Sequence, residues 1–516
     1  MTSSRLLLIA ALVAAAPACT PSTAKPTVTP AAPAPRDAAG SRAAWLDAFA
    51  RGYFPGRSGQ LFVVPREGEF VVDRNDPLYG FMHGSPWSYD THIPLLLYGP
   101  PFVKATSSST PVAQQDVVPT LAALLGTAPP ATAVGRPLRE ALATASGHPR
   151  VIALFVLDGA RADYFETYKD AIPTLSKLRA GGAWFSQAHV TSVPTLTAVG
   201  HANLGTGAEP RTHGLAVNNL FNRVTNASQE AYDHLNPGEL MALTLADVWN
   251  IQTEGKAVII GQGGAIRAAA GLVGHGGCIL NGRPVTAASY NASTGGWETN
   301  KDCYTMPAAL APLNAKAYWE KVNGTWMGHD IADTRRFRHS AVFQAFEGDA
   351  LAAVLDGAPI GADDVTDLVL VNLKGTDYVG HAYGPASPEI KAELVELDRQ
   401  IARVVGIIER KAGAGRFVLA FAADHGMPAE PKPGGRLYLD DIAKKVDERF
   451  ARGGTVVQYY KDAANNELHL DTAKLASTGV ALKDVATFLE TEKVFAAVFT
   501  EDEVRAAQSR LGAAGR

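Results

Sequence analysis

Cysteine is scarce in this sequence. There are three cysteines in 516 residues, and no two of them form a C-x-x-C pair. This absence argues against a zinc site built from thiolates. Two of the three, Cys278 and Cys303, lie 25 positions apart in a loop-rich segment, and an oxidising compartment would allow them to pair as a disulfide. The third, Cys19, follows the apolar start of the chain.

The sequence also lacks a strong net charge. Its 47 Lys and Arg residues nearly balance its 51 Asp and Glu residues, and the formal net charge is −4. That balance gives no indication that the partner is duplex nucleic acid or an anionic membrane surface. Hydrophobic residues make up 47% and charged residues 19%, which is typical of a globular protein with a large core.

The first 19 residues combine an arginine, a short apolar run and small residues, which together predict an export signal. The run is too short to span a bilayer. Small residues before Cys19 favour a lipoprotein signal, with Cys19 as a lipid anchor, but Pro17 fits that pattern imperfectly and simple secretion is an equal alternative. Either way we expect an exported protein, periplasmic or at the outer surface. Residues 20–42, rich in Pro, Ala and Thr, predict a flexible linker.

Four short runs are apolar throughout instead of alternating, at 93–99, 151–157, 367–373 and 416–423. Strands that are buried on both faces have this pattern, so the runs predict a mostly parallel sheet sandwiched by helices. Apolar residues at helical spacing predict helices at 117–126 and 388–413. The expected fold class is therefore α/β.

We expect residues 43–516 to form one catalytic α/β domain. Its core would come from residues 151–222 and 366–430, and residues 431–516 would add accessory strands and helices. Residues 223–365 are rich in Gly, Asn, Trp and Thr and have few periodic runs, so they predict an inserted cap over one end of the sheet.

Acids and histidines follow three of the four apolar runs: Asp158, Asp377 with His381 four positions later, and Asp424 with His425. Taken singly, each acid could be a helix cap or a turn former. The carboxyl ends of parallel strands meet at one edge of a sheet, where ligands bind. Together the three ends therefore predict a site for zinc or a similar divalent ion.

A turn containing Pro194 leads into a predicted helix that starts near Thr195–Thr197. A hydroxyl at a helix N-terminus lies near free N–H groups and the positive end of the dipole. That is a suitable place for a nucleophile that attacks a phosphoryl group. Simple capping of the helix by Thr195 or Thr197 is the alternative.

Four motifs in this order resemble the alkaline phosphatase superfamily, on its type I phosphodiesterase/nucleotide pyrophosphatase branch. They are LDGARADY, SVPTLTAVGHANLGTGAEPRTHGL followed by Asn218, GTDYVGHAYGP and ADHGM. The resemblance implies a phosphoric ester hydrolase acting on small phosphate esters, with an alkaline phosphatase-like fold. It also implies that Thr197 is the nucleophile that becomes phosphorylated and that the Asn218 amide binds a phosphoryl oxygen.

The resemblance further implies two Zn²⁺ ions as cofactors. One would be held by Asp158, Thr197, Asp424 and His425, and the other by Asp377 and His381. The second ion then needs another ligand. The family supplies it from a histidine near its carboxyl end, after ADHG.

This chain has the matching segment near its start instead, at 82–99, MHGSPWSYDTHIPLLLYG. The chain therefore resembles a circularly permuted member, in which 43–138 is the family's carboxyl-terminal piece and 139–150 is the joining linker. Permutation is tolerated where termini lie close together. His83 would be the missing zinc ligand, unless it is only a turn histidine, and His92 would support the zinc site or pack under the loop.

The class of ester is predicted from a missing feature. Related monoesterases carry a Lys and an Arg, two residues apart, before an Ala-Ile pair, and the matching window 258–271 lacks them, with Arg267 after Ala265-Ile266. This favours a phosphodiesterase, with a phosphomonoesterase as the alternative. A different alternative is a non-catalytic, surface-anchored binding protein of the same fold. Aromatic residues of the predicted cap could stack on a substrate or form its core: Tyr290, Trp297, Tyr304, Trp319 and Trp326.

Overall fold

The structure is a computed structural model that describes residues 41–279, 281–459, 466–493 and 495–514. The expected export signal, including Cys19, lies outside the described residues, as does the expected linker up to residue 40. The linker prediction ran slightly too far, because helix α1 (Arg42–Gly52) begins with Ser41 as its cap, and the Ser41 hydroxyl accepts from the Ala44 N–H at 3.2 Å.

The core is a ten-stranded sheet in the order β14-β13-β12-β18-β7-β19-β4-β8-β5, with β15 paired to β13. Its four central neighbours are the four predicted apolar runs, and nearly every residue in them is buried. The strands are β14 Gly296–Glu298, β13 Val285–Asn291, β12 Ile259–Gly263, β18 Asp367–Leu373, β7 Val151–Leu157, β19 Phe417–Ala422, β4 Leu95–Tyr98, β8 Ala183–Phe185, β5 Thr106–Ser108 and β15 Tyr304–Thr305.

The sheet is mostly parallel, as predicted. The pairs from β13 through β12, β18 and β7 to β19 are parallel, whereas β4 runs antiparallel to both β19 and β8. The short strands β3 (His92–Ile93), β9 (Ala188–His189) and β6 (Val112–Ala113) form a separate small sheet.

Helices cover both faces of the sheet. A Cβ at Gly261 in β12 would meet Val273 of α9 (Ile266–Val273) at 2.3 Å, whereas the next side chain, Gln262, donates to the Glu347 carbonyl of α12 (Ala341–Gly357) at 2.9 Å. Successive strand residues point to opposite faces, so α9 and α12 lie on opposite sides of the sheet.

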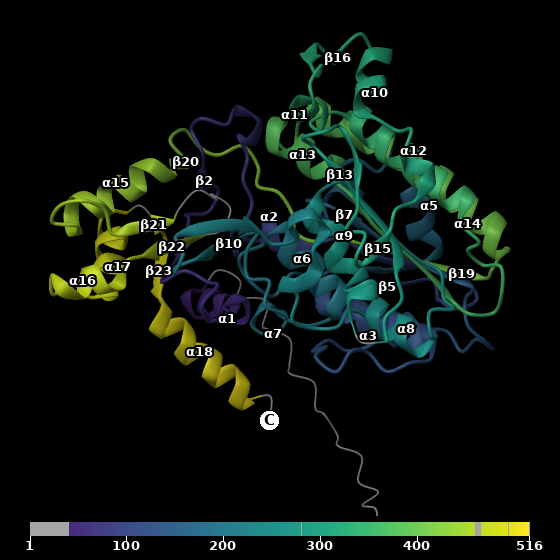
Figure 1. Ribbon diagram of the computed structural model, residues 1–516, viewed down its shortest axis with the longest axis horizontal. Coiled ribbons are helices and arrows are strands. Elements are labelled where there is room, and N and C mark those ends of the chain that lie inside the picture. The colour runs from purple at the N-terminus through teal and green to yellow at the C-terminus, as the bar shows by residue number, and fades with distance from the viewer. Residues whose placement is uncertain (1–40, 280, 460–465, 494, 515–516) are drawn as a thin grey trace, which may run out of the picture. The chain divides into compact units, whose positions relative to one another are not determined.

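The predicted helices are confirmed. They are α3 (Val117–Leu125) and α14 (Pro388–Ala412), which packs against α12 (Figure 1). The Ser387 hydroxyl caps α14 by accepting from the Ile390 N–H at 3.1 Å. Other helices of the core are α5 Pro173–Gly181, α6 Thr197–Thr206, α8 Leu245–Gln252 and α13 Gly375–Tyr383.

The prediction that 223–365 is only a cap was wrong. This segment supplies β12 and β13, both within the central sheet, and helices α8, α9 and α12. The strand β12 is five residues long and contains two glycines, so it lacks the long apolar run that marked its neighbours. The segment from β14 to helix α11 (Thr334–Phe337) adds β14 and β15 beside β13. It also contains α10 (Ala315–Lys321) and a separate two-stranded sheet of β16 (Thr325–Trp326) and β17 (His329–Asp330).

A second sheet, in the order β21-β22-β1-β23, combines the two ends of the described chain. Strand β1 (Leu61–Val64) is antiparallel to both β22 (Glu467–Leu470) and β23 (Ala497–Thr500), and β21 is Val457–Tyr459. Helices α15 (Leu439–Phe450), α16 (Thr472–Ser477), α17 (Leu482–Thr491) and α18 (Glu501–Ala514) belong to this part of the chain. The accessory elements predicted at 431–516 are present, and β1 completes them.

Three further features bear on the predictions. Cys278 and Cys303 form a disulfide, which confirms that pairing.

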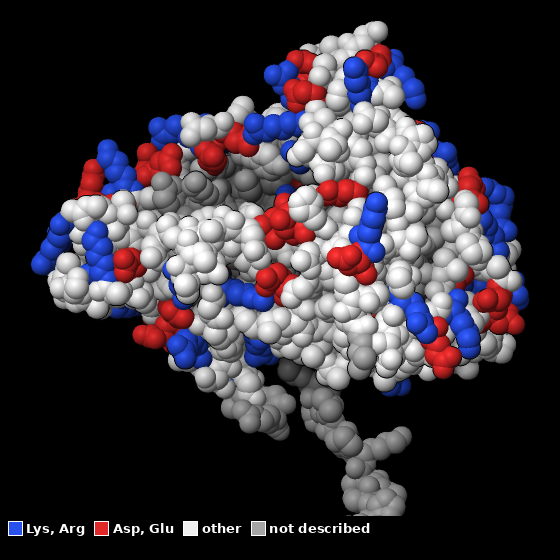
Figure 2. Space-filling model, viewed as in Figure 1, with Lys and Arg blue, Asp and Glu red and all other residues white. Residues whose placement is uncertain are grey.

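No helix among the described residues has the length and apolar content needed to cross a membrane. On the face shown in Figure 2, acidic and basic side chains are interspersed.

Candidate active site

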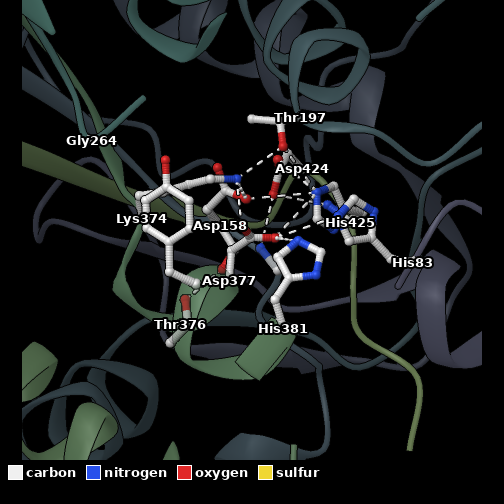
Figure 3. Close-up of polar contacts among 12 residues, drawn as sticks. His83, Asp158, Thr197, Gly264, Lys374, Thr376, Asp377, His381, Asp424 and His425 are labelled. Carbon is white, nitrogen blue, oxygen red and sulfur yellow. Dashed lines mark hydrogen bonds and ion pairs between the residues drawn. The ribbon is translucent and has the colours of Figure 1, made fainter. Parts of the chain in front are cut away.

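Three buried acids lie at the carboxyl ends of three neighbouring strands (Figure 3). Asp158 follows β7 directly, Asp424 comes two residues after β19, and Asp377 lies in the first turn of α13, after β18. Each is at most 1% exposed. The parallel register of β18, β7 and β19 therefore brings together the acids that the sequence predicted.

Two histidines face Asp377. The Nε2 atoms of His83 and His381 lie 3.5 Å and 3.3 Å from Asp377 Oδ1. Each Nδ1 is held by a backbone carbonyl, at 2.7 Å from Thr195 O for His83 and at 2.6 Å from Phe81 O for His381. A carbonyl partner fixes Nδ1 as the protonated nitrogen, so both Nε2 lone pairs point toward the carboxylate.

A second group surrounds Asp158 and Asp424. His425 Nε2 lies 3.6 Å from Asp158 Oδ1 and 3.2 Å from Asp424 Oδ2, and its Nδ1 is 2.9 Å from the Gly426 carbonyl. Two sets of donor atoms here are compact enough for one ion, those of Asp158, Asp377 and His425 and those of Asp158, His201 and Asp424. Six of the seven predicted metal-site residues, from His83 to His425, thus lie close together.

Two carboxylate oxygens in these groups have no hydrogen-bond partner, Asp377 Oδ1 and Asp424 Oδ2. A buried, unpaired carboxylate oxygen is costly, and a cation removes that cost. Both oxygens face imidazole Nε2 atoms that are also free to coordinate. Carboxylate oxygen and imidazole nitrogen are ligands that zinc and similar divalent ions prefer, so the residues fit a metal.

Thr197 is the first residue of α6, directly above these groups. Its Oγ1 lies 3.4 Å from His425 Nε2 and 2.9 Å from Lys374 Nζ, and it makes no capping bond to the helix. The capping alternative is therefore not supported for Thr197, and the Thr195 hydroxyl donates instead to the Ser85 carbonyl at 3.2 Å. Gly200 lets α6 approach, because a Cβ there would meet Asp424 Cβ at 2.6 Å.

Asn218 lies beside the start of the same helix. Its Oδ1 accepts from the Ala198 N–H at 2.9 Å. The sequence predicted the Asn218 amide as a phosphoryl-binding group and helix N–H groups near Thr197 as neighbours of an anion. In the structure the two groups lie together, and the Ala198 N–H donates to the amide oxygen of Asn218.

Three polar residues of the site were missed by the sequence analysis: Lys374, Asn372 and His201. Lys374 Nζ contacts Asp158 Oδ1 and Asp377 Oδ2, both at 2.7 Å. Asn372 Nδ2 donates to Asp158 Oδ2 at 2.7 Å and lies 3.0 Å from His201 Nε2. The signal in the sequence was a pair of polar residues two positions apart, Asn372 and Lys374, at the end of a mostly apolar run.

Burial and neighbouring charges shift the pKa values of the site. Burial, together with the Asp424 carboxylate, raises the pKa of Asp158 to about 6. Burial alone would lower the pKa of Lys374, but the carboxylates of Asp158 and Asp377 outweigh it and raise that pKa. Burial lowers the pKa of His425 well below its usual value, with nearby His83 adding to the effect, so His425 is neutral and able to coordinate.

Several candidate residues lie outside the site. His92 Nε2 is 2.9 Å from the Ser186 carbonyl and its ring stacks on His189, so it packs against residues 186–189 and not beside the acids. Arg267 forms an ion pair with Glu230 at 2.7 Å. The aromatic residues of 223–365 pack against one another or against neighbouring core residues, as in the core alternative: Tyr290, Trp297, Tyr304, Trp319 and Trp326.

Carboxylates and imidazoles at the strand ends of an α/β sheet, below a threonine at a helix start, define a candidate metallohydrolase centre. The chain matches the family model for type I phosphodiesterase/nucleotide pyrophosphatase over residues 152–513, and it belongs to that family. It is therefore a member of a phosphoric ester hydrolase family within the alkaline phosphatase superfamily.

Similar proteins include some named alkaline phosphatase and some named phosphodiesterase. Alkaline phosphatase PafA of Elizabethkingia meningoseptica is 26% identical over 400 residues, covering 67% of this chain and 73% of the relative. Venom phosphodiesterase of Macrovipera lebetinus is 24% identical over 303 residues, covering 57% of this chain and 28% of the relative.

The crystal structure of wild-type alkaline phosphatase PafA shares the fold. It superposes with a TM-score of 0.54 at 21% identity, covering 68% of this chain and 77% of that one.

Proposed function

We propose that this protein hydrolyses phosphate esters through a phosphothreonine at Thr197, with two bound zinc ions. The observation that supports this proposal most directly is the position of the Thr197 hydroxyl, at a helix start and among three carboxylates and three imidazoles. The names of the relatives, alkaline phosphatases and venom phosphodiesterases, point to the same substrate class.

The two zinc ions are assigned to the two groups of residues. Asp377, His381 and His83 would hold one ion. Asp158, Thr197, Asp424 and His425 would hold the other. When bound, such ions polarise a phosphoryl oxygen and stabilise charge on the attacking and leaving oxygens.

The chain's own groups then have defined tasks. Thr197 Oγ1 loses its proton and forms a bond to phosphorus as the bond from phosphorus to the leaving oxygen breaks, and the leaving oxygen takes up a proton. Water afterwards adds its hydroxyl to phosphorus as the bond from phosphorus to Thr197 Oγ1 breaks, and the remaining proton of the water returns to Oγ1. The Ala198 N–H and the Asn218 amide lie where they could donate to a phosphoryl oxygen, once the bond between them opens.

The class of ester has two candidates. The absence of the Lys and Arg from residues 258–271 favours a phosphodiesterase. A diester has one negative charge fewer than a monoester, so it needs fewer cations in the site. A phosphomonoesterase is favoured by a different observation, the Lys374 ammonium 2.9 Å from Thr197 Oγ1. The name of the relative PafA, an alkaline phosphatase, also agrees with the second candidate.

Replacing the nucleophile tests the proposal. Thr197→Ala should lower kcat/KM for p-nitrophenyl phosphate and for its bis ester by more than about a thousandfold, because no oxygen remains to attack. Thr195→Ala, which removes a neighbouring buried hydroxyl, is the matched control. Two zinc ions per chain by elemental analysis are expected for the wild type.

Either of two results would contradict the proposal. Retained turnover in Thr197→Ala would exclude this nucleophile. A folded wild type without metal or turnover would favour the alternative of a surface-anchored binding protein with this fold.

We also propose that the protein is exported, and that Cys19 anchors it if the signal is a lipoprotein signal. Labelling with a radioactive fatty acid in a bacterial host, with Cys19→Ala as control, distinguishes an anchored form from a secreted one.

A further inference from the structure

Lys374 is a buried lysine at the centre of the candidate site. It follows β18 directly, precedes α13 and is 1% exposed. Its Nζ lies 2.9 Å from Thr197 Oγ1, 2.7 Å from Asp158 Oδ1 and 2.7 Å from Asp377 Oδ2 (Figure 3). Among the described residues, it is the one cation that makes a hydrogen bond to Thr197.

The surrounding structure fixes the position of this lysine. The Glu347 carboxylate accepts from the Lys374 backbone N–H, with oxygens at 3.1 Å and 3.2 Å. Opposite it, a Cβ at Gly264 would meet Lys374 Cβ at 2.6 Å and Glu347 Oε1 at 1.9 Å. A side chain at residue 264 would therefore displace both, so the backbone is shaped to hold Lys374 here.

The lysine and a metal can share the same acids. On Asp377, Lys374 contacts Oδ2, whereas the unpartnered Oδ1 faces His83 and His381. On Asp424, Oδ2 is also unpartnered and faces His425. Lys374 thus leaves these two oxygens free for metal ions, whereas on Asp158 it contacts Oδ1 and Asn372 donates to Oδ2.

Charge gives this lysine a role in substrate choice. Two divalent ions against three carboxylates leave one net positive charge, which a Thr197 alkoxide cancels. Lys374 restores a positive charge next to the attacking oxygen. In a dry site an ammonium interacts more strongly with a dianionic monoester than with a monoanionic diester.

We propose that Lys374 is a catalytic residue whose ammonium contacts the transferring phosphoryl group and makes the site favour phosphate monoesters over diesters. This inference rests on the proposed function and extends it. Lys374 would take the place of the Lys and Arg that are missing from 258–271, from a different strand of the sheet. Arg267, in that window, is ion-paired with Glu230 instead.

Lys374→Met tests the proposal, with two substrates that share one leaving group. In zinc-loaded protein, kcat/KM for p-nitrophenyl phosphate should fall by about 10² to 10³, the cost of one lost charge-stabilising donor, and that for methyl p-nitrophenyl phosphate by less than about tenfold. Zinc content should stay at the wild-type value. Lys374→Arg, which keeps the charge, should keep the monoester preference at a lower rate. Arg267→Met is the matched control and should leave the substrate ratio unchanged.

A binding measurement separates this proposal from the proposed nucleophile. In Thr197→Ala, calorimetry with inorganic phosphate reports contacts to the anion without turnover, and adding Lys374→Met should weaken phosphate binding at least tenfold. The proposal would be overturned if Lys374→Met lost zinc and its kcat/KM fell equally for both substrates. Lys374 would then only neutralise the charge of the neighbouring carboxylates. A shift of substrate ratio in Arg267→Met but not in Lys374→Met would also overturn it. Retained turnover in Thr197→Ala, by contrast, would contradict the proposed function. The effect of Lys374→Met on phosphate binding would then still test the role of Lys374.

Discussion

His83 and His381 are held in the same way, although they are 298 positions apart in the sequence. Each donates from Nδ1 to a backbone carbonyl and presents Nε2 to the same oxygen of Asp377. This shared geometry is what two ligands of one ion need, since the outer partner orients the ring. It favours the ligand interpretation of His83 over the turn interpretation.

We therefore expect His83→Ala to impair the enzyme as severely as His381→Ala. Both substitutions should remove about one zinc ion per chain and lower kcat/KM by at least about a hundredfold, because each deletes a ligand of the same ion. Elemental analysis and turnover measure these effects. His92→Ala is the control, because that ring bonds to the Ser186 carbonyl outside the site. Full zinc content in His83→Ala would show that this histidine is not a ligand.

At the scale of single residues, the sequence predicted the site residues that lie in motifs. It missed those whose position in the site depends on strand geometry. Asp158, Asp377 and Asp424 follow apolar runs, so their meeting at one sheet edge could be inferred. Lys374 could not be placed, because a polar residue just after a strand can point to either face. Its contact with Thr197 depends on the register between β18 and β7 and on the approach of α6.

Helix α6 reaches the acids only because residue 200 has no side chain. A Cβ at Gly200 would meet Asp424 Cβ and the Asp424 carbonyl oxygen, both at 2.6 Å, and that backbone cannot move without moving the Asp424 carboxylate, a proposed metal ligand. Gly200→Ala should therefore destabilise the fold by about 1 to 3 kcal/mol, as overpacking does. It should also lower kcat, because it shifts Thr197 relative to Asp424.

Gly406→Ala is the matched control for that prediction. Gly406 lies inside α14, and the nearest atom to its Cβ position is Arg410 Nη1 at 3.7 Å. Alanine there should stabilise the helix by about 0.5 to 1 kcal/mol. Urea unfolding and steady-state turnover measure both variants. Wild-type behaviour of Gly200→Ala would mean that α6 and Asp424 do not pack this closely.

Strand β22 contains a buried acid, Glu467, in the second sheet. Its Oε2 accepts from the Gly59 N–H at 2.7 Å, and burial raises its pKa to about 8. Arg223 and Glu501 lie nearby, and burial lowers the pKa of neighbouring His469 to about 3. The usual pKa of a glutamate in an unfolded chain is about 4.3.

The raised pKa makes stability fall as pH rises. Between about pH 4.5 and 8 the unfolded chain releases the Glu467 proton while the folded chain keeps it, so the free energy of unfolding decreases over that window and levels off above it. Glu467→Gln cannot ionise and should not show this decrease. Urea unfolding at pH 5, 6.5 and 8 should show the wild type losing about 3 to 5 kcal/mol relative to Glu467→Gln. The His469 contribution is common to both proteins, and a pH-independent difference between them would contradict the prediction.

The elements of the core were predictable where they repeat a simple pattern. Strands buried on both faces and the long helix α14 have unmistakable apolar runs. The interpretation of 223–365 as a cap failed because β12 is short and contains two glycines, and its place in the sheet comes from pairing with β18 and β13. Pairing between distant segments leaves no local signal in the sequence.

At the scale of the whole molecule, the site needs two pieces of chain that lie far apart in sequence. The family match covers 152–513, so the segment that supplies His83 lies outside it. Helices α1 and α18 lie against each other, with Gln508 Nε2 donating to the Ala50 carbonyl at 3.0 Å and Arg510 paired with Asp47. These two contacts show that α1 and α18 run antiparallel, so the end of α18 lies near the start of α1. This arrangement supports our inference that the chain is circularly permuted.

A reordered chain tests that inference. It would start at Gly147, run to residue 514, continue through a flexible Gly/Ser linker of about eight residues and end with 41–146. Ser146 and Gly147 are exposed and belong to no helix or strand, so a cut there breaks no sheet or helix bond. We expect the reordered protein to fold, bind two zinc ions and retain kcat/KM within about threefold, because every contact of the site is kept.

A control with the same linker but a cut between Leu154 and Phe155, inside β7, should not fold, because it divides a central strand. Circular dichroism, zinc content and turnover distinguish the two proteins. A reordered chain that stays unfolded would show that the present order of the two pieces is required, and the permutation would then be wrong. A folded and active one would show that His83 can be delivered from either end of the chain, since the site depends on the position of the segment in the sheet and not on its position in the sequence.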